Sequence, residues 1–505
     1  MMEPSVPLRV LARAVPGARL LDSGDCAVSG ISYDSRLVVP GDLFAALPGA
    51  DADGHDFIPD ASRRGARALL VERAVDSPLP QIIVADSRAA LAAIAAAFFG
   101  HPSREIGVIG ITGTDGKTTT SYLVDHLLRT AGSRTGMIGT VAIRIGEQED
   151  LHASRQTTPE SSDVQRYLRQ MAASDVNWAV LEATSHGLAM HRLDHVRFQI
   201  GAVTNITHEH LDYHGSVENY RRAKAILFKR VAAESGVVVV NADDVGARSI
   251  EPYAAGARMV RYSVAGEAAD VTARNVTCDA TGSRFTLEAG EHGRASVTFP
   301  LIGSFNVANA LCAASVALAT GLDLQTIVQG LGTAPPVPGR MARIDAGQPF
   351  SVVVDYAHTP ESLSKVLELL RGLHPDGRLI AVFGSAGERD REKRPLQGAV
   401  SARLAEISVI TSEDPRNEDA EAIIAQIAAG AEATGAEPGR SLFTRTERRE
   451  AIRLAFDLAR PGDCVLLAGK GHEGSIIWGR EKLPWDEAGV ARKLLAEAGY
   501  APRAG

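Results

Sequence analysis

The sequence has few cysteines and no arrangement of them that suggests a cross-linked or metal-bound protein. Four of its 505 residues are cysteine, and no two of them form a CxxC pair. Scattered thiols are typical of reduced cysteines in a protein of the cytoplasm, and they argue against a disulfide framework or a zinc site. We therefore expect a cytoplasmic protein. The cysteines are Cys26, Cys278, Cys312 and Cys464.

The sequence also lacks a strong charge of one sign. Lys and Arg number 53 and Asp and Glu number 61, which gives a formal net charge of −8. Such a mild acidic excess argues against a nucleic-acid-binding protein, which needs a basic face, although it does not exclude a local basic pocket for a phosphorylated small molecule. With 45% hydrophobic, 23% charged and 5% aromatic residues, the chain is neither disordered, nor a coiled coil, nor collagen-like.

Long hydrophobic runs are absent too. The longest apolar run, 89–99, is far shorter than the roughly 20 residues that a membrane-spanning helix needs. Residues 1–21 contain Glu3 and three arginines without a continuous apolar stretch, so we expect no signal peptide. The expected partners are therefore small molecules, with no membrane and no nucleic acid.

The length of the chain and two stretches rich in Gly and Pro predict three α/β domains. A prior of roughly 150 residues per domain gives about three domains for this chain. Gly and Pro mark a boundary at 100–103, and the proline-rich stretch 335–339 reads as a stiff linker. The predicted domains are an N-terminal α/β domain (1–103), a central doubly wound domain of the P-loop type (104–336) and a C-terminal Rossmann-like α/β domain (337–505).

Strands alternate with helices in the second and third blocks. A buried strand at 106–112 precedes a helix at 117–131, and the pattern restarts with a strand at 352–355 and a helix at 360–371. This alternation predicts mostly parallel, doubly wound sheets. The other expected strands are 178–182, 200–204, 237–241, 379–383, 407–411 and 464–468, and the other expected helices are 87–99, 161–171, 217–228, 306–319, 395–405 and 445–458.

The turn after the strand 106–112 carries the strongest functional signal. Backbone N–H groups and a helix N-terminus at such a turn can bind phosphates, with Lys117 contacting the β- and γ-phosphates and the Thr118 hydroxyl binding Mg²⁺. The match to GxxxxGK[ST] is not strict, because Ile111 occupies the position of the first glycine. A glycine-rich turn with a solvent-exposed lysine is the alternative. The loop consists of Gly113, Thr114, Asp115, Gly116, Lys117, Thr118 and Thr119.

Ordered motifs through nearly the whole chain resemble the Mur ligase family, the ATP-dependent peptide-bond-forming enzymes of cell-wall synthesis. The chain is most similar to the branch that adds the third residue of the stem peptide, the MurE branch. The motifs are Asp34-Ser35-Arg36, Gly41–Phe44, Gly113–Thr120, Glu182–Leu188, His210–Gly215, Ala223-Lys224-Ala225, Gly303–Ala310, Pro338–Met341, Asp355–Pro360 and Gly469–Glu473.

The resemblance implies a two-step amide synthesis. ATP phosphorylates a carboxylate of UDP-N-acetylmuramoyl-L-alanyl-D-glutamate, and the amine of a diamino acid then attacks the acyl phosphate and expels inorganic phosphate. Because two anions must be brought together, positioning and charge neutralisation are the main tasks of such a site. The implied cofactors are ATP and Mg²⁺, and the chain is expected to act as a monomer whose domains close around the substrates.

The resemblance implies four catalytic residues, Lys117, Glu182, His210 and Lys224. Thr118, Glu182, His210 and Lys224 would serve the metal, since Mg²⁺ prefers hard oxygen ligands and takes few from protein. In similar ligases the lysine at the position of Lys224 is carbamylated, which turns a cation into an anion. From the residues alone, the alternative for Glu182 is a solvated strand end and for His210 one of several exposed loop histidines, whereas composition alone favours Lys224 as a solvated helix residue.

Other positions would bind the nucleotide and the UDP-linked substrate. Asn306 and Asn309 would offer amides to adenine, although Asn306 also suits a helix cap, and Arg340 and Asp355 would contact phosphate and ribose. Asp51 reads almost as well as a plain surface turn, and Met190 stands where the family often has Gln. The expected UDP-dipeptide contacts are Tyr33, Ser35, Ala50, Asp51, Ala52, Gln156, Thr157, Thr158, Thr184 and Arg192.

The identity of the added amino acid depends on one substitution. Family members that use meso-2,6-diaminopimelate typically carry Asp-Asn-Pro-Arg, whereas this chain has Glu413, Asp414, Pro415 and Arg416. The extra carboxylate should repel the second carboxylate of diaminopimelate and favour L-lysine or L-ornithine. Arg389 and Arg416 are kept, however, and can pair with a carboxylate. Diaminopimelate leads on balance, with ornithine and lysine as alternatives. Gly469 and Glu473 match the amine-end contacts of the family.

Two further interpretations remain open at this point. One is another ligase of the superfamily, such as a folylpolyglutamate synthase or a different Mur ligase, against which the UDP-type first block and the Asp355–Pro360 motif argue. The other is a nucleotide-binding scaffold without catalysis, against which the complete set of Lys117, Glu182, His210 and Lys224 argues.

Overall fold

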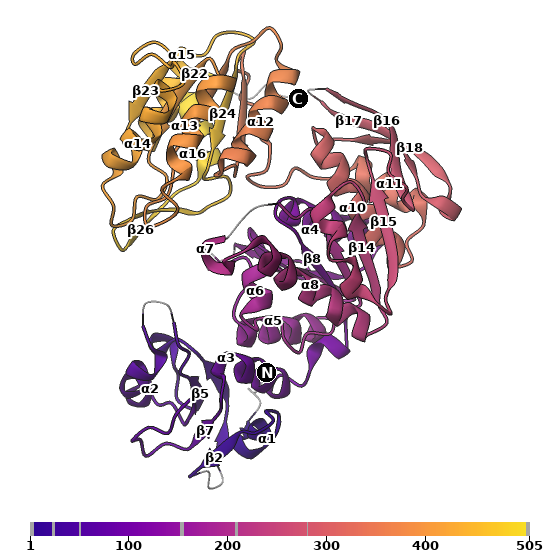
Figure 1. Cartoon of the computed structure of the whole chain (residues 1–505), viewed down its shortest axis with the longest axis vertical. Coiled ribbons are helices and arrows are strands. Elements are labelled where there is room, and N and C mark those ends of the chain that lie inside the picture. Colours follow the sequence, from indigo (N-terminus) through magenta and orange to yellow (C-terminus); the bar gives the residue numbers. More distant parts are fainter. Residues whose placement is uncertain are drawn as a thin grey trace. The chain divides into compact units, whose positions relative to one another are not determined.

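The computed structural model of the chain describes residues 5–22, 26–49, 52–151, 156–207, 211–279 and 281–500. The chain forms two compact units (Figure 1). The first comprises Met1–Val276, Arg284–Thr298 and Ser304–Thr333, and the second comprises Thr277–Ser283, Phe299–Gly303 and Ala334–Gly505. Within the described residues, no helix is long and apolar enough to cross a membrane.

The N-terminal part of the first unit is built around a five-stranded sheet. Its strands follow the order β2-β7-β6-β5-β4, with β4 to β7 parallel and β2 antiparallel to β7. The helix α3 (Ser87–Phe98) is capped by the carboxylate of Asp86 and buries its apolar face on this sheet. The strands are β2 (Arg19–Leu21), β4 (Gly30–Ser32), β5 (Asp42–Ala45), β6 (Ala68–Val71) and β7 (Gln81–Ile83), and the small elements around them are β1 (Val6–Pro7), α1 (Leu8–Arg13), β3 (Ala27–Val28) and α2 (Ile58–Arg63).

The rest of the first unit is a sheet of eleven strands in the order β11-β10-β9-β12-β8-β13-β14-β15-β16-β17-β18. Its middle, from β9 to β16, is parallel. Parallel strands are buried on both faces and therefore read as continuous apolar runs. The strands are β8 (Gly107–Thr112), β9 (Thr135–Ile138), β10 (Ala142–Ile145), β11 (Gln148–Leu151), β12 (Trp178–Glu182), β13 (Ile200–Val203), β14 (Val237–Asn241), β15 (Arg258–Ser263), β16 (Val271–Asp279), β17 (Gly282–Glu288) and β18 (Arg294–Phe299).

Helices pack against the strands of this sheet. The helices α5 (Ser161–Ala173) and α8 (Val217–Ala233) pack apolar residues against β8, β12 and β13 in one core. The helix α4 (Lys117–Thr130) packs with α10 (Ser304–Ala319), and both contact the strands. The loop 113–116 joins the end of β8 to α4 and therefore lies where the parallel strands end. The remaining helices are α6 (Ser185–Ala189), α7 (Leu211–His214), α9 (Val245–Arg248) and α11 (Leu324–Gly332).

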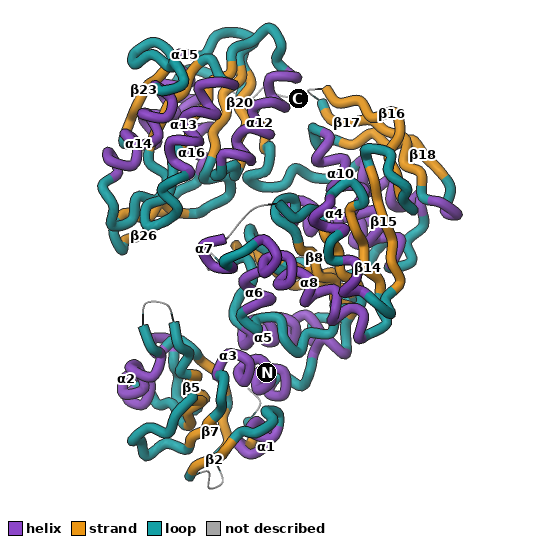
Figure 2. Tube along the Cα trace, viewed as in Figure 1, coloured by secondary structure: helices purple, strands orange, loops and turns teal. Residues whose placement is uncertain are grey.

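The second unit is a six-stranded sheet with helices on both faces, as the strand and helix colours of Figure 2 illustrate. Its order is β19-β20-β24-β21-β22-β23, parallel except for β19. Alternate residues divide between two cores: Val353 faces α12, α13 and α14, whereas Val352 and Val354 face α15 and α16. The elements are β19 (Ala342–Ile344), β20 (Ser351–Asp355), α12 (Pro360–Leu373), β21 (Leu379–Phe383), α13 (Lys393–Leu404), β22 (Ile407–Thr411), α14 (Ala420–Glu432), β23 (Leu442–Arg445), α15 (Arg448–Leu458), β24 (Cys464–Ala468), β25 (Ser475–Trp478), β26 (Glu481–Pro484) and α16 (Glu487–Glu497).

The predicted α/β class with mostly parallel sheets is confirmed. Strands β12, β14, β21, β22 and β24 have the bounds that the sequence predicts. Three expected helix starts are wrong. The helix expected from residue 445 begins at Arg448, because Arg445 pairs with Thr411 as the end of β23, and the helices expected from residues 306 and 395 begin two residues earlier, at Ser304 and Lys393. The domain boundaries at 103 and 336 stay predictions.

Candidate active site

The glycine-rich loop lies between β8 and α4, as predicted. Two of its backbone groups are held by the segment after β13: Thr114 N–H donates to the Asn205 carbonyl (2.8 Å) and Asp115 N–H to Asn205 Oδ1 (2.9 Å). The Thr114 hydroxyl also lies 3.0 Å from the Tyr220 hydroxyl on α8. Hydrogen bonds from two neighbouring segments thus hold the loop in place at the N-terminus of α4. A helix N-terminus of this kind is suited to binding an anion.

Glycine is required at two positions of this loop. Gly113 has φ 151°, and a Cβ there would lie 1.9 Å from Thr204 Oγ1. Gly116, the N-cap of α4, has φ 81°, and its Cβ would lie 2.4 Å from Asn309 Oδ1. Close approach of neighbouring side chains therefore excludes larger residues in addition to the positive φ values.

Two lysines point their ammonium groups at the same carbonyl of this loop. Lys117 Nζ donates to the carbonyls of Gly113 (3.0 Å) and Thr114 (2.8 Å). Lys224 Nζ on α8 donates to the Gly113 carbonyl at 2.6 Å and lies 4.5 Å from the centre of the Tyr220 ring. Lys224 is 1% exposed, so the structure contradicts the interpretation of Lys224 as a solvated helix residue. The loop concentrates positive charge where phosphates are expected.

The carboxylate of Glu182 lies beside the loop, at the end of β12. Its Oε2 accepts from Thr118 Oγ1 (3.0 Å) and Thr140 Oγ1 (2.8 Å), and its Oε1 accepts from Thr140 N–H (2.9 Å). Glu182 is 1% exposed, which contradicts its interpretation as a solvated strand end. A Cβ on Gly139 would lie 2.5 Å from Glu182 Oε1. The absence of a side chain at Gly139 therefore provides the space that the Glu182 carboxylate occupies.

The donors at this position fit a magnesium ion. The Thr118 hydroxyl and the Glu182 carboxylate are hard oxygen ligands 3.0 Å apart, and Mg²⁺ usually takes only one or two protein ligands alongside water and phosphate. The part of the chain that the structure describes holds no cluster of three His, Cys, Asp or Glu side chains suited to a metal. His210, the other predicted metal residue, lies outside the described residues.

Asn306 and Asn309 lie inside α10, which begins at Ser304. Asn306 is therefore not the N-cap that one interpretation of the sequence allowed. Asn309 Nδ2 donates to Asn306 Oδ1 (3.1 Å), and Asn309 Oδ1 accepts from Thr120 Oγ1 (3.4 Å). Both side chains are buried next to the phosphate loop, and their contact with adenine stays a prediction.

Three of the predicted dipeptide contacts, Thr157, Thr158 and Thr184, lie close to Glu182. Thr158 Oγ1 donates to the Glu182 carbonyl (2.8 Å) and lies 2.9 Å from Thr184 Oγ1, which in turn caps α6 by accepting from Gly187 N–H (3.0 Å). Thr157 Oγ1 lies 3.0 Å from Thr140 Oγ1. The hydroxyls of Thr140, Thr157, Thr158 and Thr184 therefore form a row beside Glu182, at the carboxyl end of β12.

Arg192 joins this row and is matched by a carboxylate that the sequence analysis missed. Arg192 donates to the Thr158 carbonyl (3.1 Å) and forms an ion pair with Glu160 (2.5 Å), which Arg88 on α3 also approaches at 3.4 Å. Arg88 further donates to the Pro48 carbonyl (3.0 Å). This network links the N-terminal sheet to the central one beside the loop expected to hold uridine.

The remaining predicted UDP contacts are separated in the described residues. The Tyr33 hydroxyl donates to Asp163 Oδ2 on α5 (2.8 Å), and burial together with this carboxylate raises the pKa of Tyr33. Ser35 is buried, whereas Ala52 and Gln156 are exposed. Ala50 and Asp51 lie outside the described residues.

In the second unit, Arg340 lies just before β19 and Asp355 is the last residue of β20. Asp355 ends β20, and its carboxylate accepts from the N–H groups of Met341 and Ala357 at 2.8 Å each. The Arg340 guanidinium lies 4.6 Å from the centre of the Tyr356 ring. Tyr356 also lies against His358 and His472, so these residues form an aromatic cluster at the carboxyl end of β20.

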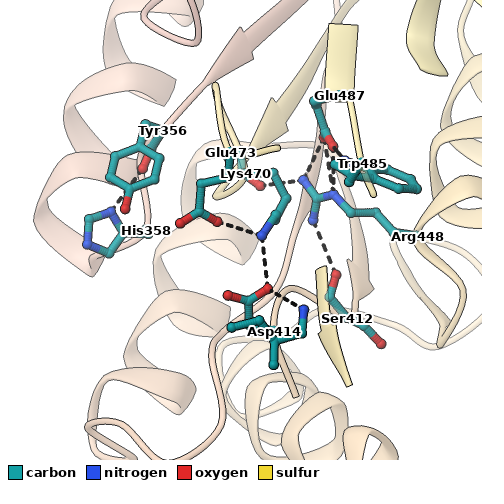
Figure 3. A network of polar contacts seen from close by, with 11 residues as sticks. Tyr356, His358, Ser412, Asp414, Arg448, Lys470, Glu473, Trp485 and Glu487 are labelled. Atoms are coloured by element: carbon teal, nitrogen blue, oxygen red, sulfur yellow. Dashed lines mark hydrogen bonds and ion pairs between the residues drawn. The ribbon is translucent and has the colours of Figure 1, made fainter. Parts of the chain in front are cut away.

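Two of the predicted amino-acid residues, Asp414 and Glu473, contact one buried lysine, Lys470 (Figure 3). Lys470 is fully buried, and its Nζ lies 2.9 Å from Asp414 Oδ1 and 2.5 Å from Glu473 Oε2. Asp414 Oδ1 also accepts from Ile477 N–H on β25 (3.0 Å). Gly469 has φ 100°, and a Cβ there would lie 3.2 Å from Glu413 Oε2. The sequence analysis did not single out Lys470, although it lies within the motif that contains Gly469 and Glu473.

Two arginines complete the surroundings of this cluster. Arg416 N–H donates to the Ile477 carbonyl (3.0 Å), its φ is 55°, and its side chain is half-buried. Arg389 is exposed and follows Gly387, whose N–H donates to the Asp414 carbonyl (2.8 Å). The loops that carry Arg389, Glu413–Arg416 and Gly469–Glu473 therefore contact one another, and their role in binding the amino acid stays a prediction.

Fold and loop together define a nucleotide-binding α/β protein. Comparison with known families matches residues 27–99 to the Mur ligase family, catalytic domain, residues 111–317 to the Mur ligase middle domain, and residues 339–471 to the Mur ligase, glutamate ligase domain. The chain belongs to the Mur ligase family.

Individual relatives cover almost the whole chain. The UDP-N-acetylmuramyl-tripeptide synthetase of Roseiflexus sp. is 49% identical over 488 residues, 94% of this chain and 95% of that protein. The UDP-N-acetylmuramoyl-L-alanyl-D-glutamate--2,6-diaminopimelate ligase of Geobacillus kaustophilus is 40% identical over 497 residues, 97% of this chain and all of that protein (100%). A solved structure of a ligase with the latter name is 31% identical, with a TM-score of 0.65 over 95% of this chain and 98% of that one.

Proposed function

We propose that the protein is an ATP-dependent ligase that joins a diamino acid to UDP-N-acetylmuramoyl-L-alanyl-D-glutamate in peptidoglycan precursor synthesis. Meso-2,6-diaminopimelate is the amino acid that the names of the relatives favour. The observation that carries the proposal is the assembly of Lys117, Thr118 and Glu182 around the glycine-rich loop. It provides a cation and two hard oxygen ligands where the phosphates of ATP would lie.

Lys117 and the loop N–H groups bind the β- and γ-phosphates in this proposal. Lys117 then exchanges its two carbonyl partners, Gly113 and Thr114, for phosphate oxygens. The site neutralises the charge that otherwise keeps the γ-phosphate and the substrate carboxylate apart. Asn306 and Asn309 lie on the adenine side, and Arg340 and Asp355 are the proposed nucleotide contacts of the second unit.

Magnesium is the proposed metal, held by Thr118 and Glu182 with His210. When bound, the magnesium ion would act as a Lewis acid that withdraws negative charge from the phosphate oxygens. Thr140 keeps Glu182 oriented through two hydrogen bonds. Lys224 is the proposed site of carbamylation, and its contact with the Gly113 carbonyl supports a role close to the bound phosphates.

The acceptor substrate lies along the hydroxyl row in this proposal. Thr157, Thr158 and Thr184 suit the oxygens of the lactyl and peptide groups, and Arg192 exchanges Glu160 for a glutamyl carboxylate. Tyr33, Ser35, Gln156 and the loop 50–52 contact the UDP group. The amino acid binds between Arg389, Glu413–Arg416, Gly469 and Glu473.

Lysine and ornithine remain the second candidates because Asp414 replaces the asparagine that is typical of diaminopimelate enzymes. The proposed location is the cytoplasm, and the proposed oligomeric state is a monomer.

The test is phosphate release by the whole chain with ATP, Mg²⁺ and the UDP-linked dipeptide, measured separately with meso-diaminopimelate, L-lysine and L-ornithine. Release that requires the dipeptide and one of the amino acids supports the proposal. The variant Lys117→Ala should abolish release. Substantial ligation by this variant would refute the assignment of the loop, and no turnover by the unaltered chain with any amino acid would refute the function.

A further inference from the structure

One buried carboxylate of the first unit lies between two arginine side chains. Glu160 Oε1 lies 2.5 Å from Arg192 Nε and 3.4 Å from Arg88 Nη1, and the same Arg88 nitrogen is 3.5 Å from Glu160 Oε2. Glu160 is 5% exposed and Arg192 is 9% exposed. Because water screens buried charges weakly, the two guanidinium groups together determine where this carboxylate lies.

The Glu160 carboxylate takes no part in capping its own helix. Glu160 is the N-cap residue of α5, but its side chain accepts no hydrogen bond from the first turn of that helix. Within the described residues, its ion-pair partners are Arg88 and Arg192. The carboxylate can therefore move from one guanidinium to the other without breaking a cap, and the N-terminus of α5 favours a negative charge in either position.

Arg192 makes weaker contacts than a buried guanidinium usually does. Its Nε lies 2.5 Å from Glu160 Oε1, yet this nitrogen forms no hydrogen bond of acceptable geometry within the described part of the chain. Its Nη1 donates to the Thr158 carbonyl (3.1 Å), and its Nη2 has the Met190 sulfur at 3.5 Å, which is a weak acceptor. A well-aligned carboxylate would bind this guanidinium more strongly, so a substrate carboxylate can replace Glu160.

Arg88 is held in a position from which it can pair with Glu160. The Asp86 carboxylate caps α3 by accepting from the N–H groups of Arg88 (2.9 Å) and Ala89 (3.0 Å). Arg88 Nη2 donates to the Pro48 carbonyl (3.0 Å), while Nη1 faces both Glu160 oxygens at 3.4 and 3.5 Å. A movement of about 0.5 Å would bring Nη1 to the usual N–H···O distance.

The other charged groups near Glu160 have partners of their own. Asp163 accepts from the Tyr33 hydroxyl (2.8 Å) and pairs with Arg166 (2.6 Å). Burial and Asp163 raise the pKa of Tyr33, Glu160 adds to this shift and Arg192 opposes it. Tyr33 therefore stays neutral at pH 7, and it supplies no charge that could compensate Glu160.

We propose that Arg88 is a positioning residue for the acceptor substrate, because it pairs with the Glu160 carboxylate once a carboxylate of the bound substrate replaces Glu160 at Arg192. This inference rests on the proposed function. Without Arg88, a buried Glu160 that leaves Arg192 has no cation beside it, which is costly in free energy. Arg88 acts through Glu160 and does not contact the reacting atoms.

Removal of the arginine tests this exchange through the KM for the UDP-linked dipeptide. In Arg88→Met, Glu160 stays at Arg192 and competes with the substrate carboxylate. We expect the KM for the dipeptide to rise at least about tenfold, as for the loss of one charge-assisted hydrogen bond. The KM for ATP and the kcat at saturating dipeptide should stay within about twofold of those of the unaltered chain. Phosphate release by the whole chain measures all three values.

A neutral side chain at position 160 separates this exchange from the support that Arg88 gives to Pro48. The double variant Arg88→Met with Glu160→Gln removes the competing charge, and its KM for the dipeptide should return to within about threefold of the original. A double variant whose KM stays as high as that of Arg88→Met would overturn the proposal, because loss of the contact with the Pro48 carbonyl would then explain the effect. Equal KM values for Arg88→Met and the unaltered chain would overturn it as well.

The single variant Glu160→Gln keeps the proposal testable if Arg88→Met does not fold. Arg192 then has a weaker competitor for the substrate carboxylate, so the KM for the dipeptide should fall at least about threefold. An unchanged or raised KM would overturn the proposal. Arg63→Met is the control, because it removes an exposed arginine of α2 that pairs with Asp60, and it should leave all three values unchanged.

The same measurements distinguish failure of the inference from failure of the proposed function. Absence of turnover by the unaltered chain with every amino acid would overturn both. Turnover by the unaltered chain with a KM for the dipeptide that is insensitive to residues 88 and 160 would overturn the inference alone.

Discussion

At the scale of single residues, the site depends on side chains held by very few contacts. Glu182 is oriented by hydroxyls from two other segments, and Gly113 is enclosed by Thr204. Small changes at such positions alter geometry before they alter the fold, because reacting groups must be placed to within a fraction of an ångström.

Thr140 is expected to matter for catalysis although it bears no charge. Thr140→Val retains the backbone N–H that donates to Glu182 Oε1 but removes the hydroxyl that donates to Oε2. We expect kcat to fall about tenfold, which is within the range for one charge-assisted hydrogen bond, with the KM for the amino acid unchanged. Steady-state kinetics at several Mg²⁺ concentrations measure this. Thr434→Val, an exposed position at the end of α14, is the control, and equal kcat values in both variants would contradict the role of Thr140.

Gly113→Ala is expected to abolish nucleotide binding. The new Cβ would lie 1.9 Å from Thr204 Oγ1 at φ 151°, so the loop must move. Gly132→Ala is the matched control, because Gly132 has φ 80° and no atom within 4 Å of a Cβ. The control should cost about 1 kcal/mol of stability and leave ATP binding intact. Calorimetric titration with ATP checks both, and tight binding by Gly113→Ala would refute the loop geometry.

At the scale of elements, the buried ion pair of Arg448 and Glu487 joins α15 to α16. Both side chains are fully buried, and Arg448 also donates to the Ala468 carbonyl at the end of β24. Trp485 Nε1 adds a hydrogen bond to Glu487 Oε2 (2.6 Å). The pair therefore fixes the position of two helices relative to the strand that precedes the Lys470 loop.

Removal of one partner should destabilise the second unit strongly. Arg448→Met leaves Glu487 buried without its cation, and we expect a loss of about 3–5 kcal/mol in the free energy of unfolding. The double variant Arg448→Met with Glu487→Gln should recover part of this loss. Arg449→Met, which breaks the exposed pair with Glu497, should cost less than about 1 kcal/mol. Urea unfolding followed by circular dichroism compares them, and similar losses for Arg448→Met and Arg449→Met would contradict the account.

Elements made of branched apolar runs could be predicted from the sequence, whereas several others could not. Strand β14 (Val237–Asn241) has the predicted bounds because a strand buried on both faces is apolar throughout. Helix α14 (Ala420–Glu432) was missed although its buried residues Ile423, Ile424, Ile427 and Ala431 recur at helical spacing. Strands β15 to β18 extend the central sheet without a clear signal. Lys117 and Glu182 were predicted. Thr140 was missed because its partner Glu182 lies 42 residues away in the sequence, whereas Lys470 was passed over although it lies three residues from Glu473 in the same motif.

At the scale of the whole molecule, each unit has its own hydrophobic cores and its own part of the proposed site. The phosphate loop, Glu182 and Lys224 belong to the first unit, and the Lys470 cluster belongs to the second. Unfolding of the first unit is therefore expected to remove the proposed ATP site, and unfolding of the second unit is expected to remove the proposed amino-acid site.

Acid should unfold the second unit through Glu418. A hydrogen bond from the fully buried Arg394 lowers the pKa of Glu418 from 4.5 to about 2. Because the pKa in the folded state is lower than in the unfolded state, this carboxylate stabilises the fold above pH 4.5, and the contribution is lost as the pH falls from 4.5 toward about 2. Glu418→Gln should lower stability at pH 7 and flatten its pH dependence in that window. Denaturation measured from pH 2 to 7 tests this, and parallel curves for both proteins would contradict it.

The central claim is that ATP activates the substrate carboxylate as an acyl phosphate beside Lys117 and Glu182. The most direct measurement uses the UDP-linked dipeptide with ¹⁸O in its reacting carboxylate and follows the released phosphate by mass spectrometry. The account predicts that, for each UDP-linked tripeptide formed, one ¹⁸O atom appears in the inorganic phosphate, because the attacking amine expels the oxygen that the carboxylate donated to phosphorus. Tripeptide formation with unlabelled phosphate would contradict it.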